Sequence, residues 1–132
     1  MTENEEEMTA LSETIERFEY KGYQCLIRKN LHMGILLGYV GLPEGHKFYG
    51  KYYDKLERHI EVHGGVTFAD FFHNGEVERD LINSGLWWIG FDCGHWMDVI
   101  PNFQLHDYPG ATYKDADFVR KEIKSMVDQL EK

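Results

Sequence analysis

Residues 85–98, GLWWIGFDCGHWMD, decide the fold because a strongly apolar run passes directly into a cluster of reactive side chains. The first half alternates with a two-residue period, the pattern of a pleated strand, and aromatic and β-branched residues favour that surface. The second half brings two carboxylates, a thiol and an imidazole to the end of this strand. These side chains belong to Asp92, Cys93, His95 and Asp98. The sequence therefore predicts a buried strand that delivers a functional site.

Two runs upstream of this stretch have the same period and predict a hairpin. Residues 23–28 and 35–40 both alternate in the manner of strands. Lys21-Gly22 has the composition of a tight turn before the first run, and residues 30–34 predict a turn between the two. We therefore expect two neighbouring antiparallel strands.

The chain between this hairpin and the central stretch is less regular. A helical turn is expected over 53–58, and residues 59–63 return to the alternation of a strand. Two glycines then interrupt the pattern before a further strand expected through 66–68. Residues 71–85 predict a long connection with a turn at an Asn-Gly pair.

Apolar residues at helical spacing predict a helix at each end of the chain. A short N-terminal helix is expected from the stripe Met8, Leu11, Ile15 and Phe18. Thr112 followed by Asp115 is a helix start signal for a long C-terminal helix. The stripe of that helix is Ala116, Val119, Ile123, Met126, Val127 and Leu130. The predicted fold class is α+β: a mostly antiparallel β-sheet with the long C-terminal amphipathic helix packed on it and the short N-terminal helix.

Length and charge restrict the possible partners. The 132 residues suit a single α+β domain over 8–132, preceded by an acidic and mobile tail over 1–7. The acidic start is unlike a secretion signal, and no apolar run approaches the ~20 residues of a membrane span, so we expect a cytoplasmic protein. A net charge of −9 argues against binding long nucleic acid or an anionic membrane. Residues 21–63 are the only positive third of the chain.

The loop 41–54, GLPEGHKFYGKYYD, is a candidate ligand lid within this positive region. Aromatic side chains can stack on a nucleobase while ammonium groups meet a phosphate, which favours a small anionic ligand. The candidate residues are His46, Lys47, Tyr49 and Lys51. The alternatives are that the aromatic rings pack under the sheet and that the lysines form a solvated face.

A second set of candidates combines imidazoles with carboxylates: His63, Asp92, His95 and Asp98, with His46 as a possible fifth member. Such a set suits a divalent transition metal that keeps open positions, or a general acid–base pair without metal. The alternative is a structural network in which the carboxylates cap backbone amides. Cys93 beside His95 could be a nucleophile, although both cysteines, Cys25 and Cys93, are also typical of buried reduced thiols.

Five motifs in order carry a resemblance that covers the chain from Tyr20 to about Leu130: YKGYQCLI, GYVGLPEGHKFYGKYYD, VHGGVTF, WWIGFDCGHWMD and YKDADFV. With them the chain resembles a family of small proteins encoded by tailed phages and prophages, a family without a settled activity. The family pattern falls on His46, His63, Gly64, Gly65, Asp92, His95 and Asp98. Relatives often have a small residue and glycine where this chain has Trp96 and Met97. The resemblance implies an accessory protein that acts against host defence signals inside an infected or lysogenic bacterium.

These observations leave three functional hypotheses open. The first is a binding protein that sequesters a small anionic, nucleotide-derived signal in a pocket built from the 41–54 loop and the 92–98 turn. Its expected ligand-binding residues are His46, Lys47, Tyr49, Lys51, His63, Asp92 and His95. The second is a metal-assisted or acid–base hydrolase of such a nucleotide, with His63, Asp92, His95 and Asp98 as catalytic or metal-ligand candidates. The third is an inhibitor of a host protein by surface contact. The apolar N-terminal stripe also predicts a homo-oligomer.

Overall fold

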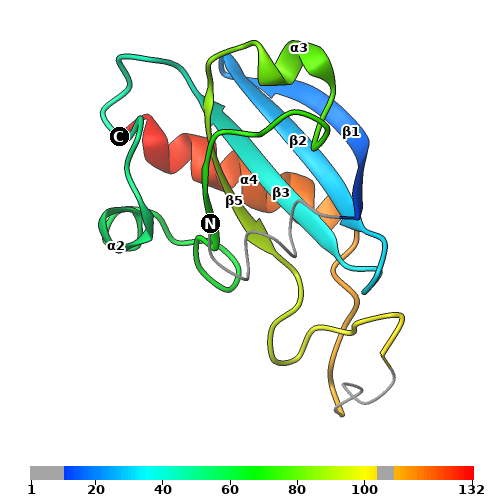
Figure 1. The fold of residues 1–132 in the computed structure, drawn as a ribbon. Coiled ribbons are helices and arrows are strands. Elements are labelled where there is room, and N and C mark those ends of the chain that lie inside the picture. The colour runs from blue at the N-terminus through cyan, green and yellow to red at the C-terminus, as the bar shows by residue number, and fades with distance from the viewer. Residues whose placement is uncertain (1–10, 104–108) are drawn as a thin grey trace.

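The computed structural model describes residues 11–103 and 109–132, and Figure 1 shows the arrangement of their elements. The strands form one antiparallel sheet with the order β1-β2-β3-β5-β4. Their bounds are β1 Ser12–Tyr20, β2 Tyr23–Asn30, β3 Leu36–Leu42, β4 Phe68–Asp70 and β5 Trp87–Asp92. The helices are α2 Tyr53–Leu56, α3 Arg79–Ile82 and α4 Ala116–Leu130. The α+β class, the antiparallel sheet and the long C-terminal helix are confirmed.

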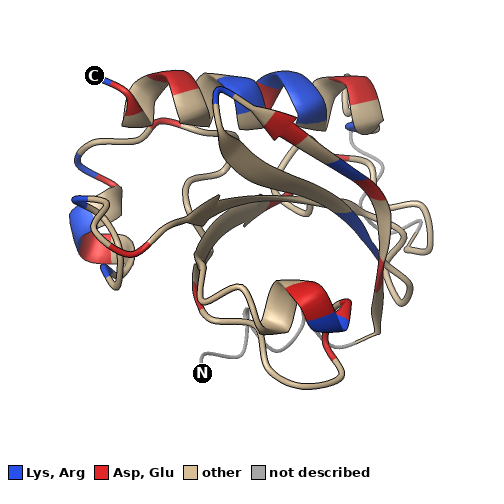
Figure 2. Cartoon of the chain, turned by 90° about the horizontal axis from the view of Figure 1, so that it is seen from above, with Lys and Arg blue, Asp and Glu red and all other residues tan. Residues whose placement is uncertain are grey.

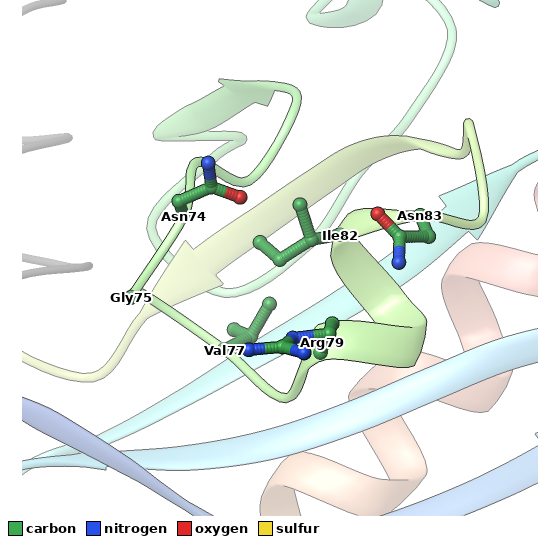
Figure 3. A pocket seen from close by; sticks show the side chains of 6 residues that line it. All are labelled: Asn74, Gly75, Val77, Arg79, Ile82 and Asn83. Carbon is green, nitrogen blue, oxygen red and sulfur yellow. The ribbon is translucent and has the colours of Figure 1, made fainter.

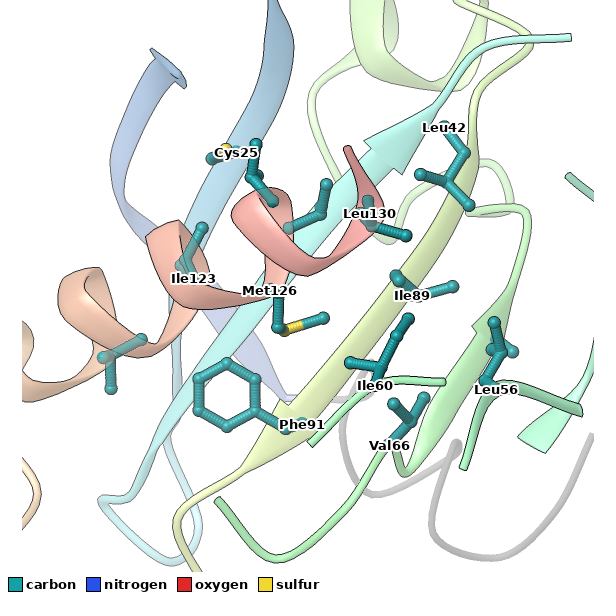
Figure 4. Close-up of a cluster of buried hydrophobic side chains, with 14 of the residues drawn as sticks. Cys25, Leu42, Leu56, Ile60, Val66, Ile89, Phe91, Ile123, Met126 and Leu130 are labelled. Atoms are coloured by element: carbon teal, nitrogen blue, oxygen red, sulfur yellow. The ribbon is translucent and has the colours of Figure 1, made fainter. Parts of the chain in front are cut away.

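The sheet is covered on both faces, as Figure 2 shows with α4 along one face and α3 on the other. On the α4 side, the helix buries Ile123, Met126 and Val127 against apolar side chains of β5. Figure 4 shows this packing, with Ile89 and Phe91 facing the helix. On the other side, a second cluster around Trp88 packs under the connection that contains α3. Burial of both sheet faces explains why β3 and β5 are almost continuously apolar.

The C-terminal helix follows its expected stripe but begins later than the start signal at Thr112. The Asp115 side chain accepts a hydrogen bond from the Phe118 amide at 2.9 Å and is the N-cap of α4. Thr112 instead forms an isolated bridge with Asp98, which ties the start of the helix to the turn after β5. The capping carboxylate therefore belongs to the second residue of the expected signal.

The expected N-terminal helix is wrong over the residues that the structure describes, because Ser12–Tyr20 is the edge strand β1. Lys21 and Gly22 both have positive φ, at 50° and 84°, and this two-residue turn joins β1 to β2 in a hairpin. Phe18 packs against the core, whereas Ile15 points outward and is 44% exposed. The spacing of the apolar residues imitated a helix by coincidence, and Met8 lies outside the described residues.

Residues 59–63, expected to be a strand, form none. The amides of His59 and Ile60 bond to the Leu56 carbonyl, and the later residues bond to side chains of α4 instead of to a neighbouring strand. The Glu61 amide donates to Gln129 Oε1 at 2.7 Å, and Gln129 Nε2 donates back to the Glu61 carbonyl at 2.7 Å. The His63 amide donates to Glu122 Oε1 at 2.8 Å. This docking fixes His63 at the surface of the helix.

Two smaller differences concern the irregular part of the chain. The long connection over 71–85 contains the short helix α3, which the sequence pattern did not predict. The strand expected through 66–68 is β4, which begins only at Phe68. Within 11–103 and 109–132, no helix is long and apolar enough to cross a membrane.

Candidate functional site

The structure brings together four of the predicted residues, His63, Asp92, His95 and Asp98, which we call the histidine–aspartate cluster. Asp92 ends β5, and His95 and Asp98 lie in the turn that follows it. His63 arrives from the segment docked on α4. The two imidazole rings lie with their centroids 5.9 Å apart at an interplanar angle of 74°. The expected convergence of the cluster is therefore present.

His63 is paired with a carboxylate that is fully buried. Its Nε2 lies 2.7 Å from Asp98 Oδ2 and 3.0 Å from Oδ1. Asp98 also accepts the His95 amide at 3.0 Å and lies 3.0 Å from Lys114 Nζ. A buried carboxylate needs such compensation, because an ion removed from water costs several kcal/mol when it is unpaired. The Asp98 side chain therefore joins three segments of chain at one point.

His95 is paired with the second carboxylate. Its Nε2 lies 3.0 Å from Asp92 Oδ1, although the N–H direction is not aligned for a hydrogen bond within the described residues. Asp92 also accepts the Gly94 amide and the Thr67 hydroxyl, both at 3.0 Å. Asp92 raises the pKa of His95 and outweighs the opposing effect of burial. His95 is thus biased toward the imidazolium form.

The second ring nitrogen of each imidazole is free. In the described part of the chain, Nδ1 of neither His63 nor His95 has a hydrogen-bond partner. Neither atom is among the buried polar atoms that lack a partner, so both reach solvent. The side chains are 20% and 33% exposed. His63 is therefore oriented by a hydrogen bond at Nε2, His95 has only a charge contact there, and both are open at Nδ1, an arrangement that suits proton transfer.

The same arrangement does not form a metal centre. Among the described residues, no group of three His, Cys, Asp or Glu side chains is placed to hold one ion. The physical reason is that the two Nε2 atoms face different carboxylates, so the donors do not point at a common position. The cluster residues fit acid–base chemistry better than they fit metal ligation.

Cys93 lies beside the cluster in sequence but points into the core. It is 2% exposed, and burial raises the pKa of its thiol above the ordinary value. Cys25 is 1% exposed, and burial raises its pKa to about 12. Both are protonated thiols at neutral pH, so the nucleophile alternative for Cys93 receives no support.

The 41–54 loop lies at the opposite end of the sheet from the cluster. In the antiparallel register, Leu42 pairs with Trp87 at the start of β5, whereas Leu37 pairs with Asp92 at its end. The Trp87 indole donates to the Lys51 carbonyl at 3.1 Å, which anchors the loop to the start of β5. The expectation of one pocket built from this loop and the 92–98 turn is therefore wrong. The pairing of β3 with β5 therefore places the loop and the 92–98 turn in two separate regions.

The loop instead forms a groove with the end of α4 and the segment after α2. This loop groove has a volume of about 440 Å³ and is lined by Lys47, Phe48, Glu57, Arg58, His59, Ile60, Glu61, Gln129 and Lys132. The centroid of the Phe48 ring lies 5.3 Å from that of His59 in the groove and 5.9 Å from that of His46, which does not line it. The groove combines an aromatic wall with three cationic side chains.

The remaining loop candidates have structural partners. His46 Nε2 lies 3.1 Å from the Tyr23 hydroxyl, and burial lowers the pKa of His46. The Tyr49 hydroxyl donates to the Gly85 carbonyl at 2.8 Å. Tyr49 also belongs to an aromatic cluster around the buried Trp87, in which Tyr52 and Phe71 are 59% and 40% exposed. The aromatic loop residues therefore pack partly on the core and partly at the surface.

One concavity involves residues that the sequence did not single out. Figure 3 shows it on the α3 side of the sheet, with a volume of about 600 Å³. It is lined by Asn74, Gly75, Val77, Arg79, Ile82 and Asn83. They come from the Asn74-Gly75 turn and from α3 and its flanks, and only the fold of the connection places them around one opening.

Comparisons of the chain with protein-family models, with curated proteins and with solved structures find no significant match. Functional assignment therefore depends on the chemistry of the two regions described above.

Proposed function

We propose that this protein binds and sequesters a small anionic, nucleotide-derived molecule in the loop groove. The observation that carries the proposal is the enclosure of Lys47, Arg58 and Lys132 around one concavity in a chain of net charge −9. A local positive site can receive a small anion, while the surrounding negative charge repels long polyanions. Glu57 and Glu61 also line the groove, so the net charge of its lining side chains is positive by a single charge.

Arg58 is the residue best placed to meet an anionic group. It is exposed in the groove and makes no hydrogen bond or ion pair within 11–103 and 109–132. Lys47 Nζ already donates to the main-chain oxygen of Lys132 at 2.7 Å, which fixes its position across the groove. A guanidinium can bind a phosphate through two parallel hydrogen bonds, whereas an ammonium acts as a point charge.

The aromatic wall supports a nucleotide over inorganic phosphate. Phe48 and His59 are inclined by 40°, and Lys47 Nζ lies 5.3 Å from the centroid of the Phe48 ring. Stacking of one base on such a ring contributes ~1–3 kcal/mol in nucleic-acid-binding proteins. A molecule that carries both a base and a phosphate would therefore bind more tightly than phosphate alone.

Binding measurements with the purified full chain test this proposal. We expect nucleoside monophosphates and cyclic mononucleotides to bind in a salt-dependent way and more tightly than inorganic phosphate. The double variant Lys47→Ala/Arg58→Ala should weaken binding at least about tenfold, since hydrogen bonds to charged groups contribute ~1.5–3 kcal/mol. Lys121→Ala is the matched control, because Lys121 is an exposed lysine on α4 outside the groove.

The fate of the ligand separates sequestration from catalysis. Heat release followed by chromatography should return a nucleoside monophosphate, which has no phosphodiester bond, intact. Unchanged affinity in the double variant, or equal affinity for phosphate and nucleotides, would contradict the loop-groove proposal.

Three other hypotheses concern the cellular role and the assembly, and they remain proposals. The resemblance to phage-encoded proteins supports a counter-defence role, with inhibition of a host protein by surface contact as an alternative supported only by the net charge of −9. A homo-oligomer is supported by Leu11 and Ile15, which are 69% and 44% exposed at the edge of the described sheet.

A further inference from the structure

We propose that His63 and His95 form a general base and a general acid that hydrolyse a phosphodiester bond, at a site separate from the loop groove. The proposal rests on how two buried carboxylates orient two partly exposed imidazoles. It adds an activity to the binding role proposed above and does not depend on it.

Asp98 selects the form of His63 that can act as a base. Because Asp98 accepts from His63 Nε2 at 2.7 Å, the Nε2 atom carries the hydrogen in neutral His63. The lone pair then lies on Nδ1, which reaches solvent. Asp98 is itself held by Lys114 and by the His95 amide, so this orientation is fixed by groups outside the imidazole. His63 is therefore preorganised to accept a proton.

Asp92 favours the form of His95 that can act as an acid. The carboxylate lies 3.0 Å from His95 Nε2 and is held by the Gly94 amide and the Thr67 hydroxyl. The carboxylate raises the pKa of His95 and so favours the protonated ring. In the imidazolium form, Nδ1 carries a hydrogen and can donate it. The two histidines thus have opposite roles because their carboxylates have different surroundings.

The spacing of the rings suits displacement at phosphorus. The centroids are 5.9 Å apart and the rings meet edge to face, so a phosphate would bind across their open Nδ1 atoms and not between the rings. His63 Nδ1 removes a proton from water as the water oxygen bonds to phosphorus. The bond from phosphorus to the leaving oxygen breaks, and that oxygen takes the proton from His95 Nδ1. The products are a phosphomonoester and an alcohol, and proton exchange with solvent restores both rings.

The backbone at Gly64 packs directly against the His95 ring. Gly64 has a φ of 69°, and a Cβ atom at this position would lie 2.2 Å from His95 Nε2, so only glycine fits against the ring. The Gly64 amide has no hydrogen-bond partner among the described residues. An unpaired N–H beside the rings can donate to a non-bridging phosphate oxygen.

Two probes with different leaving groups test the assignment in the full chain. We use bis(p-nitrophenyl) phosphate, whose phenolate leaves readily, and a ribodinucleotide, whose alkoxide needs a proton. Wild-type protein should cleave both. His63→Ala should lower both rates by about 100-fold or more, as expected for loss of a general base. His95→Ala should lower dinucleotide cleavage by about 100-fold, but cleavage of the p-nitrophenyl ester only a few-fold.

Controls separate this role from a structural one. His73→Ala should leave both rates unchanged, since His73 is an exposed histidine 3.6 Å from Asp70, outside the cluster. His95→Gln provides a second variant if the alanine variant does not fold. The proposal is overturned if wild-type protein cleaves neither probe. It is also overturned if the His95 variants lose both rates equally, or if a chelator abolishes cleavage.

Discussion

Asp98 both stabilises the fold and orients a residue of the candidate site. Its side chain is fully buried and contacts His63, Lys114 and the His95 amide. Arg28 presents a different solution for a buried charge, because it is 2% exposed and donates to hydroxyl and carbonyl oxygens of Thr14, Ser12 and Glu76. Burial accordingly lowers the pKa of Arg28. Of these two buried charges, Asp98 is the one with an opposite charge in contact, the Lys114 ammonium.

We predict that Asp98→Ala destabilises the domain by about 3–5 kcal/mol, because it leaves the Lys114 ammonium and His63 without their buried partner. Denaturant unfolding monitored by tryptophan fluorescence measures this loss. Asp54→Ala is the control, since Asp54 is exposed on α2 and should change stability by less than about 0.5 kcal/mol. Equal stability of the two variants would contradict the assignment of Asp98 as the anchor of the turn.

At the scale of elements, the edge strand β1 depends on contacts with both layers. Glu16 pairs with Arg120 of α4 at 2.7 Å, and Arg17 pairs with Asp80 of α3 at 2.8 Å. In the turn after β1, Lys21 forms a further ion pair with Asp128 of α4 at 2.7 Å. These pairs are at the surface and contribute little individually, so the hairpin turn has the larger role in placing β1.

We predict that Gly22→Ala destabilises the hairpin by about 1 kcal/mol. Gly22 has a φ of 84°, and no atom lies within 4 Å of a Cβ placed there, so the cost is purely conformational. Gly22→Asn is the matched control, because asparagine tolerates this region and should lose less stability. Thermal unfolding of the two variants measures the difference, and an alanine variant as stable as wild type would exclude the positive-φ turn.

The sequence predicted well the strands whose side chains are buried by apolar residues on both faces of the sheet. Alternation identified β2, β3 and β5 because each is buried by tertiary packing that agrees with its local pattern. The strand β1 was missed because Ile15 and Phe18 lie at helical spacing, although the Lys21-Gly22 turn already implied a strand on each side. Residues 59–63 were misassigned because the hydrogen-bond partners of the Glu61 and His63 amides are side chains of α4, which no local pattern contains.

The candidate site was predictable from the sequence only where its residues lie close together along the chain. His95 and Asp98 follow β5 within one turn, so sequence proximity brings them to Asp92. His63 could be suggested only from its type, because the contact with Asp98 spans 35 positions. The 41–54 loop was assigned to the wrong end of the sheet, since its place follows from the pairing of Leu42 with Trp87.

At the scale of the whole molecule, the two sites are connected by the same rigid elements. The loop groove uses the end of α4, at Gln129 and Lys132, whereas the cluster lies near its start, where the Phe118 ring is 5.1 Å from His63. Strand β5 likewise runs from the anchor of the loop at Trp87 to the cluster at Asp92. Because α4 packs on β3 and β2 and shares a buried cluster with β5, each site is held by the core and not by the other site.

The pH dependence of folding follows from the groups around His95, whose ring faces Asp92, Asp98 and His63. Asp92 raises the pKa of His95, so this pair contributes stability that is fully present below about pH 6.5 and is lost as the pH rises through the folded pKa. Burial opposes ionisation of Asp92, but His95, the Gly94 amide and the Thr67 hydroxyl outweigh it and lower the pKa of Asp92. The contribution of Asp92 is therefore present above about pH 4 and is lost as the pH falls through its folded pKa.

We therefore predict that the difference in unfolding free energy between wild type and His95→Gln is largest between about pH 4 and 6.5. Glutamine supplies a polar amide near Asp92 but cannot carry the charge, so the variant isolates the electrostatic contribution. Denaturant unfolding at about pH 5.5 and about pH 8.5 measures the difference directly. His73→Gln should show no comparable change between the two conditions, because His73 is an exposed histidine 3.6 Å from Asp70. A His95→Gln difference of the same size at both pH values would show that Asp92 does not hold His95 in its charged form.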